Sequence, residues 1–168
     1  FAGGSALKEC VFCNIASGKL PCNKIWEDKN YIAFLGGSPN TEGMSVVIPK
    51  LHYPSYAFDL PDDVLSNLVI ATKKVACILD NYFNDVGRTG MVFEGYGVDH
   101  VHSKLFPMHG TGNSSDFKPI TSKIEKYFDQ YEGYLSSHDA KKANRVYLAD
   151  LSEKIRESQR TAIYQAKA

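Results

Sequence analysis

The sequence predicts an α+β fold, with an antiparallel sheet, one long helix and an appended C-terminal helical segment. Short strand-like runs come before and after one long stretch of helical periodicity, and a thinner helical stripe follows near the end of the chain. The strands and helices do not alternate along the chain, as they would in a parallel βαβ fold. The chain has 168 residues, of which 43% are hydrophobic, so it is long enough to bury a core.

Turn residues separate the strand-like runs from one another. The first two runs are joined by Asp28, Lys29 and Asn30, which suits a hairpin. The third run is apolar and stops at Pro49, as expected of a buried strand, and a glycine-rich turn joins the last two. The five predicted strands are residues 24–28, 31–35, 43–50, 87–94 and 98–106.

Residues 61–83 have the periodicity of a long helix with one apolar face. Pro61 suits the first turn, and Asp62 and Asp63 complement the helix dipole there. The apolar positions recur three or four residues apart, so they line one side. They are Leu65, Leu68, Val69, Val75, Ala76, Leu79, Tyr82 and Phe83.

The chain divides into a flexible N-terminus, a main domain and a C-terminal extension. We expect a flexible N-terminus over residues 1–9 and the main domain over residues 10–116. Residues 117–168 are predicted to be a helical extension that packs on this domain, because Leu148, Leu151 and Ile155 form an apolar stripe.

Charge and composition exclude several classes of partner. Lys+Arg and Asp+Glu both number 19, so the formal net charge is zero and non-specific nucleic-acid binding is disfavoured. No apolar run reaches the roughly 18 residues that span a membrane, so no membrane partner is expected. No signal peptide is visible and the four cysteines are too few for a disulfide scaffold. We therefore expect a cytoplasmic protein with reduced thiols.

A histidine-rich run near residue 100 is the first candidate for chemistry. Alternate residues of a strand share a face, so His100, His102 and Lys104 are predicted to point the same way. Two imidazoles and an ammonium on one face suit an anionic group, and an imidazole can attack phosphorus while a cation stabilises the phosphoryl oxygens. A polar, solvent-facing edge strand explains the same spacing equally well.

The pair Cys10-x-x-Cys13 is the second candidate. Tetrahedral zinc takes four nitrogen or sulfur ligands, and this pair supplies two of them. A redox pair or two buried thiols would have the same spacing. The histidines that could complete a zinc site are His52, His100, His102, His109 and His138.

From Cys10 to Pro107 the sequence resembles the histidine triad (HIT) superfamily of nucleotide hydrolases and transferases. Five segments appear in the family's order. Residues 10–15 resemble its entry motif and residues 24–28 and 32–35 its first hairpin. Residues 46–52 resemble the strand that ends in Pro-Lys-x-His, and residues 100–104 occupy the place of the triad. The resemblance implies a HIT-like antiparallel sheet and a HIT-like domain over residues 10–116.

The resemblance also implies roles for individual residues. In the family the middle histidine of the triad, His102 here, attacks the α-phosphate of a nucleotide and forms a covalent nucleotidyl-histidine. His100 and Lys104 flank it as further catalytic residues. Members with zinc hold a structural ion through the positions of Cys10, Cys13, His52 and His100. The family's nucleotide pocket corresponds to Val11, Phe12, Ile15, Phe34, Gly36 and Gly97, with Gly97 offering a backbone N–H to phosphate.

Several positions depart from the family's pattern. Lys104 replaces the third triad histidine, and lysine is a poorer proton shuttle than histidine at neutral pH. Gly36 replaces the aspartate that accepts the ribose hydroxyls, and Phe93 replaces a phosphate-side asparagine. Ser103 stands where the family usually has an apolar residue. The nucleophile position is retained, whereas the residues that would select the substrate are changed.

The sequence thus predicts an enzyme that acts at the α-phosphate of a nucleotide, as a phosphohydrolase or nucleotidyl transferase. The substrate classes that the resemblance implies are dinucleoside polyphosphates, such as diadenosine tetraphosphate, and nucleoside phosphoramidates. A nucleotide-binding regulatory module with little turnover is the alternative, and a zinc-stabilised scaffold for dimer assembly is a third hypothesis. The family resemblance also implies a homodimer.

Overall fold

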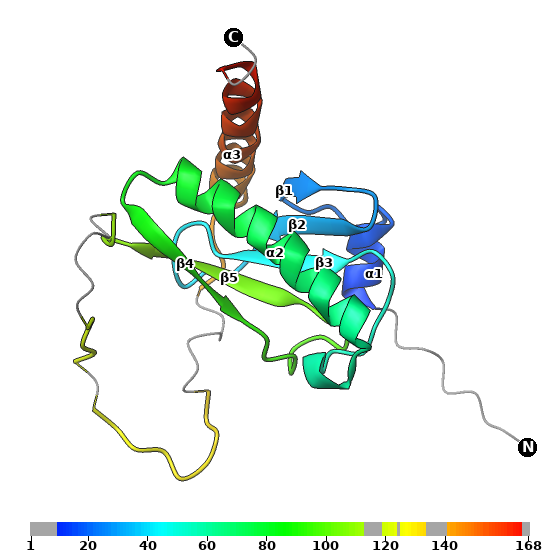
Figure 1. Cartoon of the computed structure of the whole chain (residues 1–168), viewed down its shortest axis with the longest axis vertical. Helices are drawn as coiled ribbons and strands as arrows, with labels where there is room; N and C mark the ends of the chain where they lie inside the picture. Colours follow the sequence, from blue (N-terminus) through cyan, green and yellow to red (C-terminus); the bar gives the residue numbers. More distant parts are fainter. Residues whose placement is uncertain (1–9, 113–118, 124, 134–140, 166–168) are drawn as a thin grey trace, which may run out of the picture.

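The computed structural model describes residues 10–112, 119–123, 125–133 and 141–165, and Figure 1 shows their arrangement. Five strands and two long helices form the body, together with one short α-helix and a 3-10 turn, Ala57–Asp59. The helices are α1 (Val11–Ala16), α2 (Asp62–Tyr82) and α3 (Arg145–Gln165). The strands are β1 (Lys24–Glu27), β2 (Tyr31–Leu35), β3 (Ser45–Pro49), β4 (Val86–Val92) and β5 (Ser103–His109).

The five strands form one antiparallel sheet in the order β1-β2-β3-β5-β4. Helix α2 crosses one face of this sheet, and the short helix α1 lies next to β3 in Figure 1. The predicted α+β fold with an antiparallel sheet, one long helix and a C-terminal helix is therefore confirmed.

The hairpin between β1 and β2 forms because Asp28 caps its own turn. The Asp28 carboxylate accepts hydrogen bonds from the backbone N–H groups of Asn30 and Tyr31, both at 2.8 Å. Such a side-chain bond replaces part of the backbone bonding that a turn lacks. Glu27 pairs with Ile32 across the hairpin.

Alternation along β2 divides the sheet into two packed faces. Ala33 and Leu35 belong to the main core, which α2 covers with Leu68, Val75 and Leu79. Ile32 and Phe34 point to the opposite face, where they form a second cluster. This second cluster also contains Val46 and Ile48 of β3 and packs against Phe12, Ile15, Ala16 and Cys22. The short helix α1 therefore packs on this second apolar cluster, on the sheet face opposite α2.

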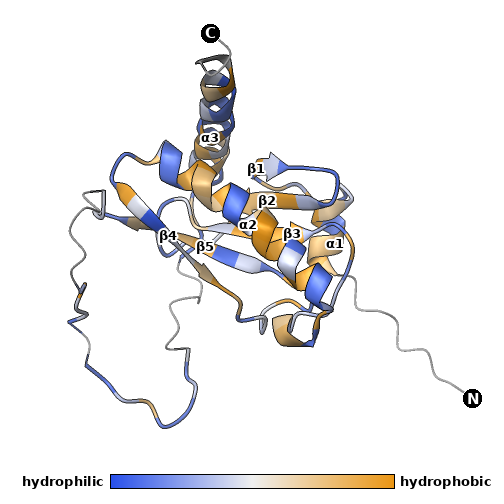
Figure 2. Ribbon diagram, in the orientation of Figure 1, coloured by the Kyte–Doolittle hydropathy of each residue, from blue (hydrophilic) through white to orange (hydrophobic). Residues whose placement is uncertain are grey.

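The apolar stripe of the C-terminal extension joins the main core. Leu148, Leu151 and Ile155 are buried among core residues that include Ile25 of β1. Figure 2 shows hydrophilic residues interspersed with hydrophobic ones along α3 where it projects beyond the sheet. No helix among the described residues is long and apolar enough to cross a membrane.

The last predicted strand begins later than the sequence indicates. Residues 98–106 were expected to be a strand, whereas β5 runs from Ser103 to His109. The backbone before it bonds elsewhere: His100 N–H donates to the Val98 carbonyl and Val101 N–H to the Tyr53 carbonyl. Pairing of β5 with β3 stops at Ser103–Val47, two residues short of Pro49, which has no N–H to continue a ladder. The predicted flexible N-terminus, residues 1–9, and His138 lie outside the described residues.

Candidate active site and metal site

Helix α1 begins at its own cysteine motif. Cys10 is the N-cap residue of the helix, and its sulfur accepts a hydrogen bond from the Cys13 backbone N–H at 3.4 Å. One helical turn separates the two residues, so both sulfurs lie at the same end of α1. The helix was not among the predicted elements, because six residues are too few to establish a periodicity.

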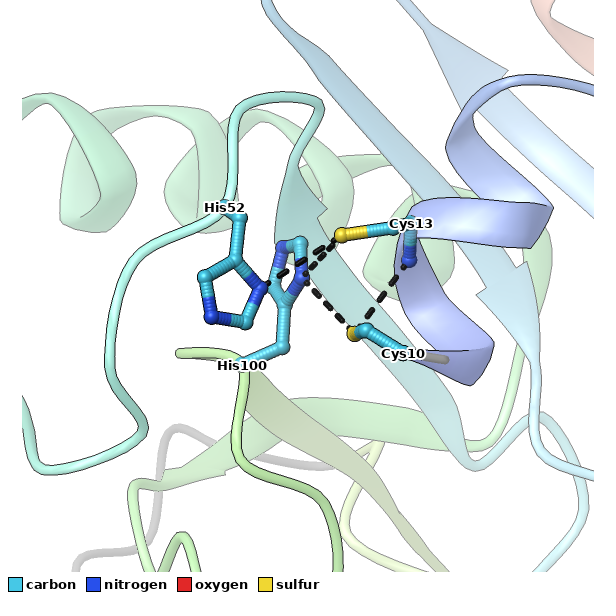
Figure 3. A group of neighbouring side chains, drawn as sticks. All are labelled: Cys10, Cys13, His52 and His100. Carbon is cyan, nitrogen blue, oxygen red and sulfur yellow. Dashed lines mark hydrogen bonds between the residues drawn. The ribbon is translucent and has the colours of Figure 1, made fainter. Parts of the chain in front are cut away.

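The two cysteines meet two histidines from distant parts of the chain. His52 follows β3, and His100 precedes β5. Figure 3 shows all four side chains pointing toward a common centre, and their ligand atoms lie within 4.8 Å of one another. The Nδ1 atom of His100 is 3.4 Å from the Cys10 sulfur and 3.5 Å from the Cys13 sulfur, and the Nδ1 atom of His52 is 3.4 Å from the Cys13 sulfur.

These separations fit a tetrahedral zinc ion. Zinc bonds of about 2.3 Å to sulfur and about 2.0–2.1 Å to nitrogen place those two atoms about 3.6 Å apart in a tetrahedron. The Nε2–H of His100 donates to the Pro49 carbonyl at 2.9 Å, which leaves Nδ1 as the nitrogen with a lone pair toward the sulfurs. Burial lowers the pKa of His100, so the ring is neutral, as a ligand must be. The four residues can therefore hold a zinc ion in a closed Cys2His2 site.

His102 lies beside this cluster and is also buried. Its Nδ1–H donates to the His100 carbonyl at 2.7 Å, because a carbonyl oxygen can only accept. This bond leaves Nε2 as the ring nitrogen with a lone pair. The Phe12 ring contacts His102 edge-on, with ring centroids 5.1 Å apart, and burial lowers the pKa of His102. The ring is thus neutral, fixed in one tautomer and held in one orientation, which is what a nucleophile requires.

The residues that alternate with His100, His102 and Lys104 along the chain lie on the opposite face of the sheet. Val101 and Leu105 are part of the core under α2. Ser103 is fully buried beneath α2, where its hydroxyl is 2.7 Å from the Thr72 hydroxyl. Thr72 in turn donates to the Leu68 carbonyl. The polar side chain of Ser103 is therefore matched by a polar partner on the facing helix.

A cleft of about 480 Å³ opens over the sheet next to His102 and Lys104. Phe12 of α1 and Phe34 of β2 form apolar walls, and residues from the loops after β2 and β4 form the rims. Of the pocket residues that the sequence predicts, Phe12, Phe34, Gly36 and Gly97 line this cleft. Ile15 packs instead in the apolar cluster behind it, and Val11, which is partly exposed, does not line it.

Several lining residues were not singled out from the sequence. They are Gly37, Ser38, Met44, Val46, Glu94 and Val98. Alternation along β3 would have placed Val46 on the face of the sheet that carries Phe34, since the two residues are cross-strand partners. The rim residues lie on loops, whose positions have no periodic signal.

The chain belongs to the HIT domain family, whose model matches residues 17–110. An uncharacterized HIT-like protein from Methanocaldococcus jannaschii is 35% identical over 116 residues, which are 66% of this chain and 88% of that protein. The adenosine 5′-monophosphoramidase hnt1 from Schizosaccharomyces pombe is 34% identical over 100 residues, which are 58% of this chain and 73% of that protein.

A solved structure shows the same fold. The chain superposes on a zinc-bound histidine triad family protein from Mycobacterium smegmatis with a TM-score of 0.63 and 20% sequence identity. The match covers 94% of this chain and 97% of that one. The sheet, the long helix and the C-terminal helix are thus arranged as in a HIT protein.

Proposed function

We propose that the protein is a nucleotide hydrolase or nucleotidyl transferase that acts at the α-phosphate through a covalent intermediate on His102. The observation that carries this proposal is the single tautomer of His102, with its Nε2 lone pair available at a cleft that Lys104 also lines. The monophosphoramidase name of a relative supports a nucleoside phosphoramidate as the first substrate to test. Dinucleoside polyphosphates such as diadenosine tetraphosphate are the second class.

The reaction proceeds in two displacements at phosphorus. Nε2 of His102 attacks the α-phosphorus, a P–N bond forms, and the bond to the leaving group breaks with its electron pair, so that the departing amine or phosphate takes a proton from solvent. Water then attacks the same phosphorus and releases one proton to solvent, the P–N bond breaks with its electron pair returning to Nε2, and the nucleoside monophosphate leaves while the imidazole returns to its neutral form. The Lys104 ammonium stabilises charge on the phosphoryl oxygens in both steps.

The cluster of Cys10, Cys13, His52 and His100 has a structural role in this proposal. These four residues would hold a zinc ion, which would supply a rigid link between α1 and the segment before β5. Through the His100 carbonyl, the same segment fixes the tautomer of His102. Phe12 on α1 completes the wall of the cleft beside that ring.

The decisive test compares the wild type with His102→Ala on adenosine 5′-phosphoramidate and on diadenosine tetraphosphate. We expect turnover and an acid-labile phosphorus–nitrogen adduct in the wild type, and a loss of at least about 1000-fold in kcat for His102→Ala. His109→Gln is the control, because His109 bonds to Asp85 and to the Glu42 carbonyl and does not line the cleft. Retention of activity by His102→Ala would exclude the mechanism.

A nucleotide-binding module with little turnover is the second candidate function. It is favoured by Lys104, a cation in place of a proton-shuttling histidine, and by the altered residues Gly36 and Phe93. It predicts that AMP binds while neither substrate yields product or adduct.

A further inference from the structure

A second cleft, of about 420 Å³, lies directly beside the first. The two clefts share a rim made of Gly37 and Ser38, which follow β2. The far wall of the second cleft comes from the part of the C-terminal extension where α3 begins, and it includes Lys142 and Arg145. Cys22 and Asn23, just before β1, complete it.

The extension is attached to this rim by its backbone. The Ala143 N–H donates to the Gly37 carbonyl at 3.1 Å. Asn144 then starts α3, since its side-chain oxygen accepts from the backbone N–H of Val146 at 2.8 Å. Leu148, one turn later, is buried in the main core. The backbone that carries Lys142 and Arg145 is therefore fixed on one side by the Ala143–Gly37 hydrogen bond and on the other by the burial of Leu148.

The second cleft has a positive lining. None of the described residues that line it is a carboxylate. Within the part of the chain that the structure describes, neither Lys142 nor Arg145 forms an ion pair, whereas Lys24, Lys50 and Lys154 each pair with a carboxylate. Lys142 and Arg145 line the cleft together with the polar residues Ser38 and Asn23, and neither cation has a carboxylate partner among the described residues, so the cleft is suited to a phosphate group.

The order of strands places this cleft at the nucleoside end of the active site. His102 and Lys104 lie on the β5 side, Val46 on β3 and Phe34 on β2, and the second cleft lies beyond β2 toward β1. Strands are about 4.8 Å apart, so the sheet between β5 and β2 spans roughly 10 Å. A nucleotide whose α-phosphate meets His102 would place its base and sugar over the apolar part of the first cleft, and its sugar would then lie next to the Gly37–Ser38 rim.

We propose that the second cleft binds a second phosphate that the nucleotide carries on its ribose, at the 2′ or 3′ position. The substrate class would be nucleotides that are phosphorylated on the ribose as well as activated at the 5′ phosphate. This proposal rests on the function proposed above. Such a nucleotide differs from one with an extended 5′ polyphosphate in where its additional phosphate lies. The 5′ chain would leave the first cleft at the His102 end, away from the second cleft.

The test measures dissociation constants of the zinc-loaded full chain for four probes. They are AMP, adenosine 2′,5′-bisphosphate, adenosine 3′,5′-bisphosphate and ATP. We expect at least one bisphosphate to bind about tenfold or more tightly than AMP, the gain expected for a charge-assisted phosphate contact. The double variant Lys142→Ala/Arg145→Ala should lose this gain, while its AMP affinity changes less than about twofold.

Matched variants separate a specific contact from a change in charge or stability. Lys141→Ala/Arg160→Ala removes the same charge from residues that do not line the cleft, and it should keep the gain. Arg145→Lys keeps the cation and should retain most of the gain. Both double variants should unfold at the wild-type temperature, because the four side chains are exposed.

Three results of the binding measurements would overturn the proposal. Equal affinity for AMP and both bisphosphates would do so, as would a bisphosphate gain that survives in Lys142→Ala/Arg145→Ala. A gain for ATP alone, lost in that variant, would assign the cleft to the 5′ chain instead. If AMP binds and the phosphoramidate is turned over without any bisphosphate preference, this inference fails while the proposed function stands. If the bisphosphate preference appears without His102-dependent turnover, the proposed function fails and the second cleft remains a ligand site.

Discussion

At the scale of single residues, the Met44 side chain occupies the space that a side chain at position 36 would need. A Cβ atom added at Gly36 would lie 2.5 Å from the Met44 Cε and 2.8 Å from its Sδ. The Gly36 N–H also donates to the Met44 carbonyl at 2.9 Å. The small residue at position 36 is therefore coupled to a large side chain that fills the space beside it.

This coupling predicts that Gly36→Asp forces the flexible end of the Met44 side chain to move and destabilises the fold by about 1 kcal/mol, the lower end of the range for overpacking. Met44→Ala should also be destabilising because Met44 is buried, but the double variant should lose less stability than the sum of the two. Gly37→Asp is the matched control, since a Cβ there meets nothing within 4 Å. Denaturant unfolding of the wild type, the two single variants and the double variant measures the double-mutant cycle. Strictly additive losses of stability would contradict the coupling.

Among the elements, α1 depends most on a partner outside itself. It has only six residues, none of them buried, and an isolated helix of that length is not stable. Two contacts hold it: Phe12 and Ile15 pack on the apolar cluster of β2 and β3, and its cysteines meet His52 and His100.

Zinc removal is therefore predicted to loosen α1 first. We expect about one zinc ion per chain, a metal affinity at least about 100-fold weaker in Cys13→Ser, and a lower unfolding temperature for both that variant and the chelated wild type. Hydrogen exchange should rise over residues 10–16 before it rises in α2.

Cys77→Ser provides the comparison for the zinc prediction. Cys77 is an exposed thiol on α2 outside the cluster, so its replacement should change neither the zinc content nor the unfolding temperature. A wild-type protein that is purified without chelators and contains no zinc would refute the site.

For the molecule as a whole, the C-terminal extension is part of the folded body. Ile155 is completely buried and belongs to the same core cluster as Leu68 and Val75 of α2. The extension also forms one wall of the second cleft, so the stability of α3 and the shape of that cleft are linked.

This packing predicts that Ile155→Ala lowers the free energy of unfolding by about 2–5 kcal/mol, the usual loss for a large buried side chain. Unfolding should remain a single transition, because the helix and the sheet share one core. Ile163→Ala, on the exposed part of the same helix, should change stability by less than about 0.5 kcal/mol. A separate early transition for α3 would show that the extension is not part of the core.

The fold and part of the site could be predicted because they depend on apolar and polar residues that recur with the period of a helix or a strand. The spacing of Leu68, Val75 and Leu79 predicted α2, and the Asp28 turn predicted the first hairpin. Alternation around residue 102 separates His102 from Val101 and Ser103 in the structure, although β5 begins only at Ser103. Short and irregular segments have no such period, which is why α1 and the rim at Gly37 and Ser38 were missed.

By itself the sequence determined the types and order of the elements, the apolar faces that pack them and the chemical groups available near residue 100. The tertiary structure alone decided how those groups are used. The Pro49 carbonyl selects which ring nitrogen of His100 faces the two cysteines, and the His100 carbonyl selects the tautomer of His102. The bond from Ala143 to Gly37 places Lys142 and Arg145 beside the second cleft. Each of these choices depends on a hydrogen-bond partner that no local pattern specifies, because backbone carbonyls are the same at every position and only the fold brings a particular one into reach.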